Sequence, residues 1–322
     1  MAPASLLVFA GIISVQLGAG LAGRMFTQLG PAGVTGLRLW WSALIVAALG
    51  GRALARTLQT VVADRAWRDL AIAVGFGVVL GVMNFSIYQS FARIPLGVAV
   101  TIEFLGPLGV AVASSRRWLD VLWVAMAAGG VLLLTQGGAR LATSTGAAAS
   151  QAGRAGPVLG LGTQAAGIAF ALVAAAGWAA YILLSRATGR RFSGSSGLVI
   201  AMVVAAIVVT GPAIGQAGPA LLHPGVVAEG LAIGLLSSVI PYRLELEALR
   251  RVPAGLFGIW MSLEPAVAAL MGLLLLSETL LGRQWLAIAL VIVACAAAAW
   301  ADAARSGGTD PPDQGNLPPP PA

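Results

Sequence analysis

The sequence predicts an all-α, polytopic membrane protein with ten transmembrane helices in two inverted five-helix repeats. The observations behind this prediction are an apolar composition, ten apolar windows and a repeated motif. Of the 322 residues, 58% are hydrophobic and only 10% are charged, whereas about 25% of residues are charged in a typical soluble domain. Mean hydropathy is +0.90. So few charges cannot cover the surface of a soluble fold of this length, which leaves an integral membrane protein.

The apolar windows have the length of membrane-spanning helices. A helix needs about 20 apolar residues to cross the hydrocarbon core of a bilayer. Ten windows qualify, at residues 4–23, 33–50, 70–91, 95–114, 118–136, 165–185, 196–214, 226–249, 254–276 and 284–301. They are too long for barrel strands and show no alternation of apolar and polar residues. A ten-helix bundle is therefore expected.

Composition divides the chain into four parts. Residues 1–136 and 165–301 hold five windows each and are the two predicted repeats. Residues 137–164 are rich in Gly, Ala, Ser and Thr, which predicts a flexible extracytoplasmic linker. Residues 302–322 end in a proline run and are expected to be a disordered cytoplasmic tail.

The arginines predict the orientation. All 19 basic residues are arginine. Thirteen lie in the connections on one side of the windows and five in those on the other, while Arg38 lies inside the second window. Cytoplasmic loops carry the excess of positive charge, which places both termini in the cytoplasm. An even number of spans also requires the termini to share a side.

One motif occurs in both halves. Residues 93–107 read RIPLGVAVTIEFLGP and residues 251–265 read RVPAGLFGIWMSLEP, so that a constant offset of 158 pairs Arg93 with Arg251, Pro95 with Pro253, Gly97 with Gly255 and Pro107 with Pro265. Each segment lies in the fourth window of a set of five. Because five is odd, the second set enters the membrane from the opposite side, which is the usual basis of alternating access. Pro107 and Pro265 lie inside their windows and are expected to kink both helices.

Two acidic residues are predicted near the middle of the membrane. Glu103 follows Pro95 by eight residues, or ~12 Å of helix, and Glu264 follows Pro253 by eleven, or ~16 Å. Half of the hydrocarbon thickness is ~15 Å. Acids at this depth usually mark transport pathways, so each is a candidate for binding a substrate amine or a proton. The alternative is a structural cap on carbonyls that the prolines leave free.

Other polar side chains could line the same cavity. Asn84 and Tyr88 lie in the third window, and Tyr242 lies in the eighth. Gln16 is in the first window, and Trp260 precedes Glu264 by about one helical turn, so that it could form part of the cavity wall.

Charged residues near the window ends have two interpretations. Arg38 could reach the outer surface with its long side chain or bind a substrate carboxylate. Arg243 and Glu247 are spaced to form an ion pair one helical turn apart. Glu245 is expected near water at the inner end of its helix.

Several function classes are excluded. The arginines form no basic patch, so nucleic acid is not an expected partner. One cysteine, Cys295, and one histidine, His223, cannot build a Cys- or His-rich metal site. The sequence contains no Walker loop and no H-E-x-x-H or G-x-S-x-G motif, so neither a cofactor nor an enzymatic activity is expected.

Three strings resemble a known transporter family. ARIPLGVAVTIEFLGPL (92–108), SSVIPYRLELEALRRVP (237–253) and MSLEPAVAALMGLLLLSETL (261–280) are similar to the EamA branch of the drug/metabolite transporter superfamily, and most similar to its bacterial threonine/homoserine exporters. The resemblance implies a secondary carrier in the bacterial inner membrane, with a central cavity that exports small amino acids such as threonine and homoserine, driven by protons. The residues of this sequence that match the family's motif most directly are Glu103, Pro107, Tyr242, Glu264 and Pro265, and the resemblance implies that they have the family's roles. A carrier of other metabolites or drugs, in either direction, is the alternative, and a membrane sensor or enzyme is a third.

Overall fold

The computed structural model describes residues 3–63, 66–113, 122–123, 125–127, 129–130, 133, 161–192 and 196–306. These residues are helical, with short connections and no strand. Within them, nine segments are long and apolar enough to cross a membrane: Ala4–Arg24, Phe26–Leu49, Trp67–Phe91, Leu96–Ala113, Gly162–Gly189, Ser196–Leu222, Pro224–Leu249, Leu256–Leu276 and Gly282–Ala301. The all-helical, multi-pass prediction is confirmed for this part of the chain. Three predicted parts of the chain are not tested in full. The described residues include only a few of the window at 118–136, the last four of the linker at 137–164 and none of the tail from residue 307.

The helices differ from the predicted windows mainly at their ends. They are α1 (Ala4–Arg24), α2 (Phe26–Ala63), α3 (Trp67–Phe91), α4 (Leu96–Glu103), α5 (Leu105–Ala113), α7 (Leu161–Gly189), α8 (Ser196–Ala217), η1 (Gly218–Leu222), α9 (Pro224–Gly234), η2 (Leu235–Val239), α10 (Ile240–Leu249), α11 (Ala254–Met261), α12 (Glu264–Leu276) and α13 (Gly282–Ser306). α2 extends well beyond the window at 33–50. α7 includes the last four residues of the predicted linker, and α13 includes the first five of the predicted tail.

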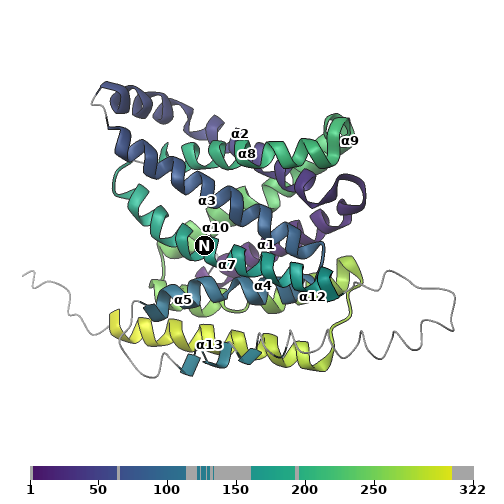
Figure 1. Cartoon of the computed structure of the whole chain (residues 1–322). Coiled ribbons are helices and arrows are strands. Elements are labelled where there is room, and N and C mark those ends of the chain that lie inside the picture. Colours follow the sequence, from purple (N-terminus) through teal and green to yellow (C-terminus); the bar gives the residue numbers. More distant parts are fainter. Residues whose placement is uncertain are drawn as a thin grey trace, which may run out of the picture.

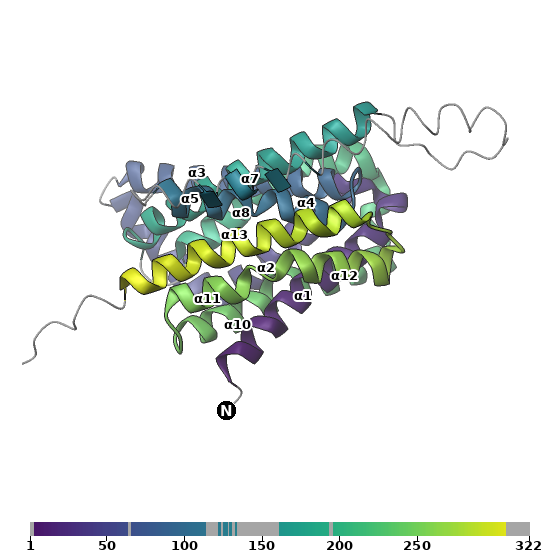
Figure 2. The ribbon, with the colours of Figure 1, turned by 90° about the horizontal axis from the view of Figure 1, so that it is seen from below.

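The bundle has two sides. α8 packs closely against α2 and α3, α3 packs against α7, and α1 packs against α10, α11 and α12. Figure 1 shows α2 and α8 along one edge and α13 along the opposite edge. In Figure 2, α11 and α12 run beside α13. Helices from both halves of the sequence therefore lie next to each other throughout the bundle.

A kink near the start of α2 places this helix against α8. Gly30 has φ 67° and ψ 165°, a conformation that glycine adopts without steric cost. Pro31 follows at a position where a missing N–H costs little. The backbone N–H of Ala32 then donates a 2.7 Å hydrogen bond to the side-chain oxygen of Gln216 in α8. The packing of α2 on α8 is thus fixed at this end by a helix cap.

The repeated motif has the same backbone conformation in both copies. α4 and α11 each have eight residues and begin at the same point of the motif. The φ and ψ angles are −54° and 142° at Pro95, and −59° and 145° at Pro253. The residues that end the two helices also match, with −63° and −13° at Phe104 and −62° and −14° at Ser262. The sequence repeat is therefore a structural repeat over this segment.

The beginning of the fourth span packs directly on the backbone of α12. A Cβ atom added at Gly97 would lie 2.6 Å from both the Cα and the Cβ of Ala269. Such a distance is not possible between carbon atoms that are not bonded, so only glycine allows α4 and α12 to lie this close. Ala269 is itself 2% exposed, and its small side chain completes the contact.

Gly97→Ala is expected to separate these helices and to lower thermal stability clearly. The matched control is Gly75→Ala in α3, where an added Cβ meets nothing within 4 Å. Away from such contacts alanine favours a helix over glycine by up to about 1 kcal/mol, so the control is expected to be neutral or slightly stabilising. The measurement is the thermal unfolding midpoint of each variant purified in detergent. Equal midpoints for both variants would contradict the close contact.

Glu278 connects the end of the ninth span to the start of the fourth. It lies in the connection between α12 and α13, after Ser277, which has a left-handed φ of 55°. One of its carboxylate oxygens accepts a 2.9 Å hydrogen bond from the backbone N–H of Leu96, the first residue of α4. Burial raises the pKa of Glu278 above the ordinary value of 4.5, and the Leu96 hydrogen bond only partly opposes this.

The raised pKa predicts the sign of a pH effect. A carboxyl group whose pKa is higher in the folded protein stabilises the fold at low pH, and this contribution is lost as the pH rises from about 4.5 through the folded-state pKa. Glu278→Gln keeps the acceptor oxygen but cannot ionise. Its thermal midpoint, relative to that of the unmodified protein, is therefore expected to increase as the pH is raised from 4.5 to 8. Parallel pH curves for the two proteins would be the contrary result.

Candidate functional site

A polar pocket lies between the two halves of the bundle. Its volume is about 210 Å³, below the ~300–1,000 Å³ of typical pockets for drug-sized ligands. Seven of the eight predicted substrate or proton ligands line it: Gln16, Arg38, Asn84, Tyr88, Glu103, Tyr242 and Glu264. These residues come from α1, α2, α3, α4, α10 and α12. The fold therefore brings together side chains that are far apart in the sequence.

Two broken helices meet at the pocket. The fourth span is interrupted at Phe104, between α4 and α5, and the ninth at Ser262 and Leu263, between α11 and α12. Each break comes shortly before a proline, Pro107 or Pro265, which has no N–H for the carbonyl four residues earlier. Those carbonyls belong to Glu103 and Met261, which both line the pocket and are equivalent in the repeat. The prolines thus leave polar backbone groups beside the pocket in each half.

Glu264 is buried and held in place by a side chain from the other half. It is 7% exposed, and its Oε1 atom accepts a 2.8 Å hydrogen bond from Nε2 of Gln16. It is also the first residue of α12, where the helix dipole favours a negative charge. Within the described part of the chain, the amide oxygen of Gln16 has no hydrogen-bond partner. A donor entering the pocket would find the Glu264 carboxyl and this oxygen close together.

Arg38 faces the pocket and is held by Tyr88. Its Nη1 atom donates a 3.0 Å hydrogen bond to the Tyr88 hydroxyl, and its guanidinium carbon lies 5.2 Å from the Tyr88 ring centroid. Tyr88 is 1% exposed, so this support is rigid. Among the described residues, no carboxylate forms a salt bridge with Arg38. Of the two interpretations of Arg38, the geometry favours the one in which the guanidinium is available to an anion.

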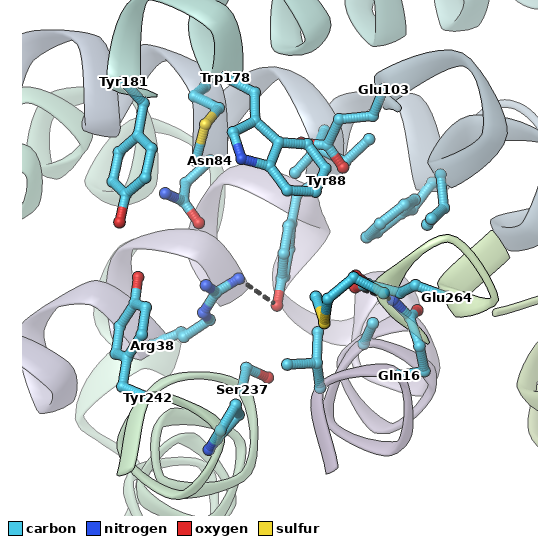
Figure 3. A pocket seen from close by; sticks show the side chains of 18 of the residues that line it. Gln16, Arg38, Asn84, Tyr88, Glu103, Trp178, Tyr181, Ser237, Tyr242 and Glu264 are labelled. Carbon is cyan, nitrogen blue, oxygen red and sulfur yellow. Dashed lines mark hydrogen bonds between the residues drawn. The ribbon is translucent and has the colours of Figure 1, made fainter. Parts of the chain in front are cut away.

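The polar groups are divided between two sides of the pocket. Figure 3 shows Arg38 and Tyr242 on one side, with Glu103 and Glu264 on the other. The hydroxyl groups of Tyr181 and Tyr242 point toward each other next to Arg38. The pocket therefore offers a positive end with hydroxyl groups and an end that carries two acids.

Asn84 also presents a polar atom to this space. Its Nδ2 atom donates a 2.8 Å hydrogen bond to the Leu80 carbonyl in its own helix. This bond uses one of the two N–H donors of the amide, so the second N–H and the side-chain oxygen are the polar groups that Asn84 offers to the pocket.

A short π-helix shapes the wall formed by the eighth span. Over η2 the Ile240 N–H bonds to the Leu235 carbonyl, five residues earlier. In the same pattern, the N–H of residue 241 would donate to the Leu236 carbonyl, but residue 241 is proline and has no N–H. The Ser14 hydroxyl donates to that carbonyl instead, at 2.7 Å. The irregular turn is thus stabilised by α1, and Pro241 and Tyr242 line the pocket directly after it.

Trp260 does not line this pocket, contrary to the prediction. It packs in a separate apolar cluster with Val8, Ile12 and Ala248. The prediction assumed a continuous helix, in which residues 260 and 264 share a face. The break at residues 262–263 removes that relation, and Met261 lines the pocket instead.

The predicted ion pair of Glu247 also differs. Its partners in the described structure are Arg250 at 3.5 Å and Arg251 at 2.5 Å, rather than Arg243. Because α10 ends at Leu249, both arginines lie in the turn after the helix, where they can fold back onto the carboxylate.

Four further pocket residues were not among the predicted substrate or proton ligands. Glu245, Trp178, Tyr181 and Ser237 all line the pocket. Trp178 and Tyr181 are three residues apart on α7, a spacing that places them on one face. Glu245 was expected near water at the helix end, but it is half-buried beside Gly11 of α1. The signal for Ser237 was its position four residues before a proline inside an apolar window.

A second groove is a weaker candidate because it lacks charge. It has a volume of about 320 Å³ and is lined by apolar side chains of α2, α8, η1 and α9, with Thr210 and the two indoles of Trp40 and Trp41 as its polar groups. Trp40 and Trp41 already donate to Thr210 and to the Val227 carbonyl. This groove cannot compensate the charges of a polar solute.

Comparison with known proteins gives the family. The chain is 37% identical over 296 residues to the threonine/homoserine exporter RhtA of Salmonella typhimurium strain LT2, which covers 90% of this chain and 88% of that protein. RhtA of Escherichia coli strain K12 is 37% identical over 295 residues, covering 89% and 88%. The model of the EamA-like transporter family matches residues 165–300. The chain belongs to the EamA-like transporter family. This EamA protein is therefore a transporter and not an enzyme, as the sequence predicted.

A solved structure supports the fold of this EamA protein. One crystal structure matches with a TM-score of 0.54 and 20% sequence identity, over 94% of this chain and 99% of that chain. The similarity extends over nearly the whole chain. Together with the apolar helices and the bacterial relatives, it identifies a multi-pass protein of the bacterial inner membrane.

Proposed function

We propose that this EamA protein exports small zwitterionic amino acids, such as threonine and homoserine, by alternating access. The main observation is that Arg38, without a carboxylate partner in the described structure, shares one pocket with Glu103 and Glu264. The curated relatives that carry the name threonine/homoserine exporter support the substrate class.

The pocket matches the charge pattern of an α-amino acid. The carboxylate of the substrate binds the Arg38 guanidinium, which has several donors in a fixed plane. The ammonium group has three donors, and it binds at Glu103 or Glu264, with the amide oxygen of Gln16 as a further acceptor. An uncompensated charge at membrane depth is costly, so each substrate charge needs an opposite charge in the pocket. The small pocket volume favours small side chains.

The two halves are proposed to be inverted repeats of five spans each, with 137–164 as the outer connection. The matching conformations of residues 95–104 and 253–262 support a duplicated unit. An odd number of spans in each unit reverses its direction in the membrane. Rocking of the third and fourth spans against the eighth and ninth would then open the pocket to each side in turn. Ten spans would place both termini on the same side of the membrane, and the excess of arginine in the connections on that side makes it the proposed cytoplasmic side.

Protons are the proposed coupling ion. The acid that does not hold the substrate ammonium can bind and release a proton. Movement of protons down their gradient can then drive export of the substrate. Gln16 holds Glu264 in place from α1. Because these helices belong to different halves, a change in the charge of Glu264 acts on the contact between them.

Transport by purified protein in liposomes tests the proposed function. Vesicles are loaded with threonine, homoserine or an unrelated metabolite, and counterflow of radiolabelled substrate is measured with and without a pH gradient. We expect counterflow of threonine or homoserine. A pH gradient that drives protons in the direction opposite to the substrate is expected to accelerate it. Movement of other metabolites or drugs without movement of small amino acids would instead support the alternative carrier function.

A further inference from the structure

Ser237 has an unusual hydroxyl group for a buried serine. It lies in η2, is 8% exposed and lines the polar pocket. Its Oγ atom has no hydrogen-bond partner among the described residues. Leaving a buried hydroxyl without a partner is unfavourable. Two other buried hydroxyls, those of Ser90 and Thr188, share this property, but neither lines the pocket.

The common local solution for such a hydroxyl is not used here. Serine and threonine in helices usually donate to a carbonyl three or four residues earlier. Thr101 donates to Gly97 in this way, and Thr210 donates to Ala206. Ser237, which lies in the π-helix, forms no such bond among the described residues. Its hydroxyl is a buried group without a partner on a residue that lines the pocket.

Two neighbouring polar groups of η2 do have partners. The Ser238 hydroxyl accepts a 3.0 Å hydrogen bond from Ser42 of α2, and the Leu236 carbonyl accepts one from Ser14. Gly18 of α1 makes room for Ser237, since a Cβ atom added at Gly18 would lie 2.2 Å from the Ser237 Oγ. α1 therefore supports the Ser237 side chain without bonding its hydroxyl.

The geometry points to Ser237 as the residue that recognises a hydroxyl group on the substrate side chain. This inference rests on the proposed function. Figure 3 shows Ser237 at the wall of the pocket that holds Arg38 and Glu264, so that the three approach from different elements. A substrate with its carboxylate at Arg38 and its ammonium at Glu103 or Glu264 presents its side chain to a third group. A serine hydroxyl can both donate to and accept from an alcohol. An apolar side chain would leave Ser237 without a partner, so the site favours hydroxy amino acids.

Ser237→Ala tests this role through substrate preference. Threonine and valine have nearly the same shape and differ by a hydroxyl in place of a methyl group. Inhibition of radiolabelled threonine counterflow by unlabelled threonine and by valine gives their relative affinities. We expect the preference of the unmodified protein for threonine to fall by about 3- to 10-fold in the variant, which is the usual size of one neutral hydrogen bond. Ser238→Ala, which changes a hydroxyl already bonded to Ser42, is expected to keep the preference.

Each outcome has a distinct meaning. An unchanged threonine-to-valine ratio in Ser237→Ala, or an equal loss of affinity for both, overturns the role of Ser237. A protein that transports no small amino acid refutes the proposed function itself. If Ser237→Ala is not recovered as folded protein, Ser237→Cys gives the same comparison, since it keeps the size of the side chain but replaces the hydroxyl by a weak thiol donor. A full preference in Ser237→Cys would then overturn the inference.

Discussion

Arg38→Gln is expected to lower transport of threonine at low substrate concentration by about 100-fold or more. The variant removes the positive charge that faces the pocket and leaves a substrate carboxylate without a counter-charge. Initial rates of counterflow in liposomes, measured over a range of threonine concentrations, give this change. Because the interaction contributes to binding, the half-saturating concentration is expected to rise.

The control for this experiment is another arginine of the same chain. Arg93 donates to the carbonyl and the side-chain oxygen of Gln89, at 2.5 and 2.7 Å, and does not line the pocket. Arg93→Gln is expected to retain most of the transport activity. Comparable rates for Arg38→Gln and the unmodified protein would assign Arg38 a structural role with Tyr88.

Glu264→Gln is expected to reduce threonine counterflow by about 10- to 100-fold if Glu264 holds the substrate ammonium. Glutamine retains the size of the side chain and an oxygen for the Gln16 hydrogen bond, but it carries no charge. If Glu264 exchanges the proton instead, counterflow persists and its stimulation by a pH gradient is lost. The measurement is counterflow with and without the gradient.

Glu103→Gln completes the comparison, because the two acids divide these roles. One variant should lose substrate affinity and the other should lose the response to the gradient. Glu247→Gln is the control, since Glu247 is paired with Arg250 and Arg251 outside the pocket. If Glu103→Gln and Glu264→Gln both behave like this control, the acids have no part in transport.

The sequence predicted the parts of the structure that follow from composition and spacing. Length and hydropathy were sufficient for nine of the spans, because a bilayer imposes both on any helix that crosses it. The repeated prolines lie shortly after the points where the fourth and ninth spans are interrupted. Glu103 and Glu264 were identified because charge at membrane depth is rare.

Features that depend on three-dimensional irregularity were not predicted. Trp260 was misplaced because a helix break cancels the spacing rule for the residues on either side of it. Ser237 was missed because its one local signal, the proline four residues later, does not show that the helix would form a π-turn. Glu245 was assigned to the helix end, since only the packed structure shows that α1 covers it. The kink of α2 at Gly30 was not predicted, and the helix after it is capped by Gln216, a residue distant in the sequence.

The central claim is that a single pocket recognises both charges of an amino acid. Competition against radiolabelled threonine by threonine amide, which lacks the carboxylate, and by 3-hydroxybutyrate, which lacks the ammonium group, tests it most directly. The account predicts that the unmodified protein binds both analogues at least about 10-fold more weakly than threonine. Either analogue competing as well as threonine would contradict it.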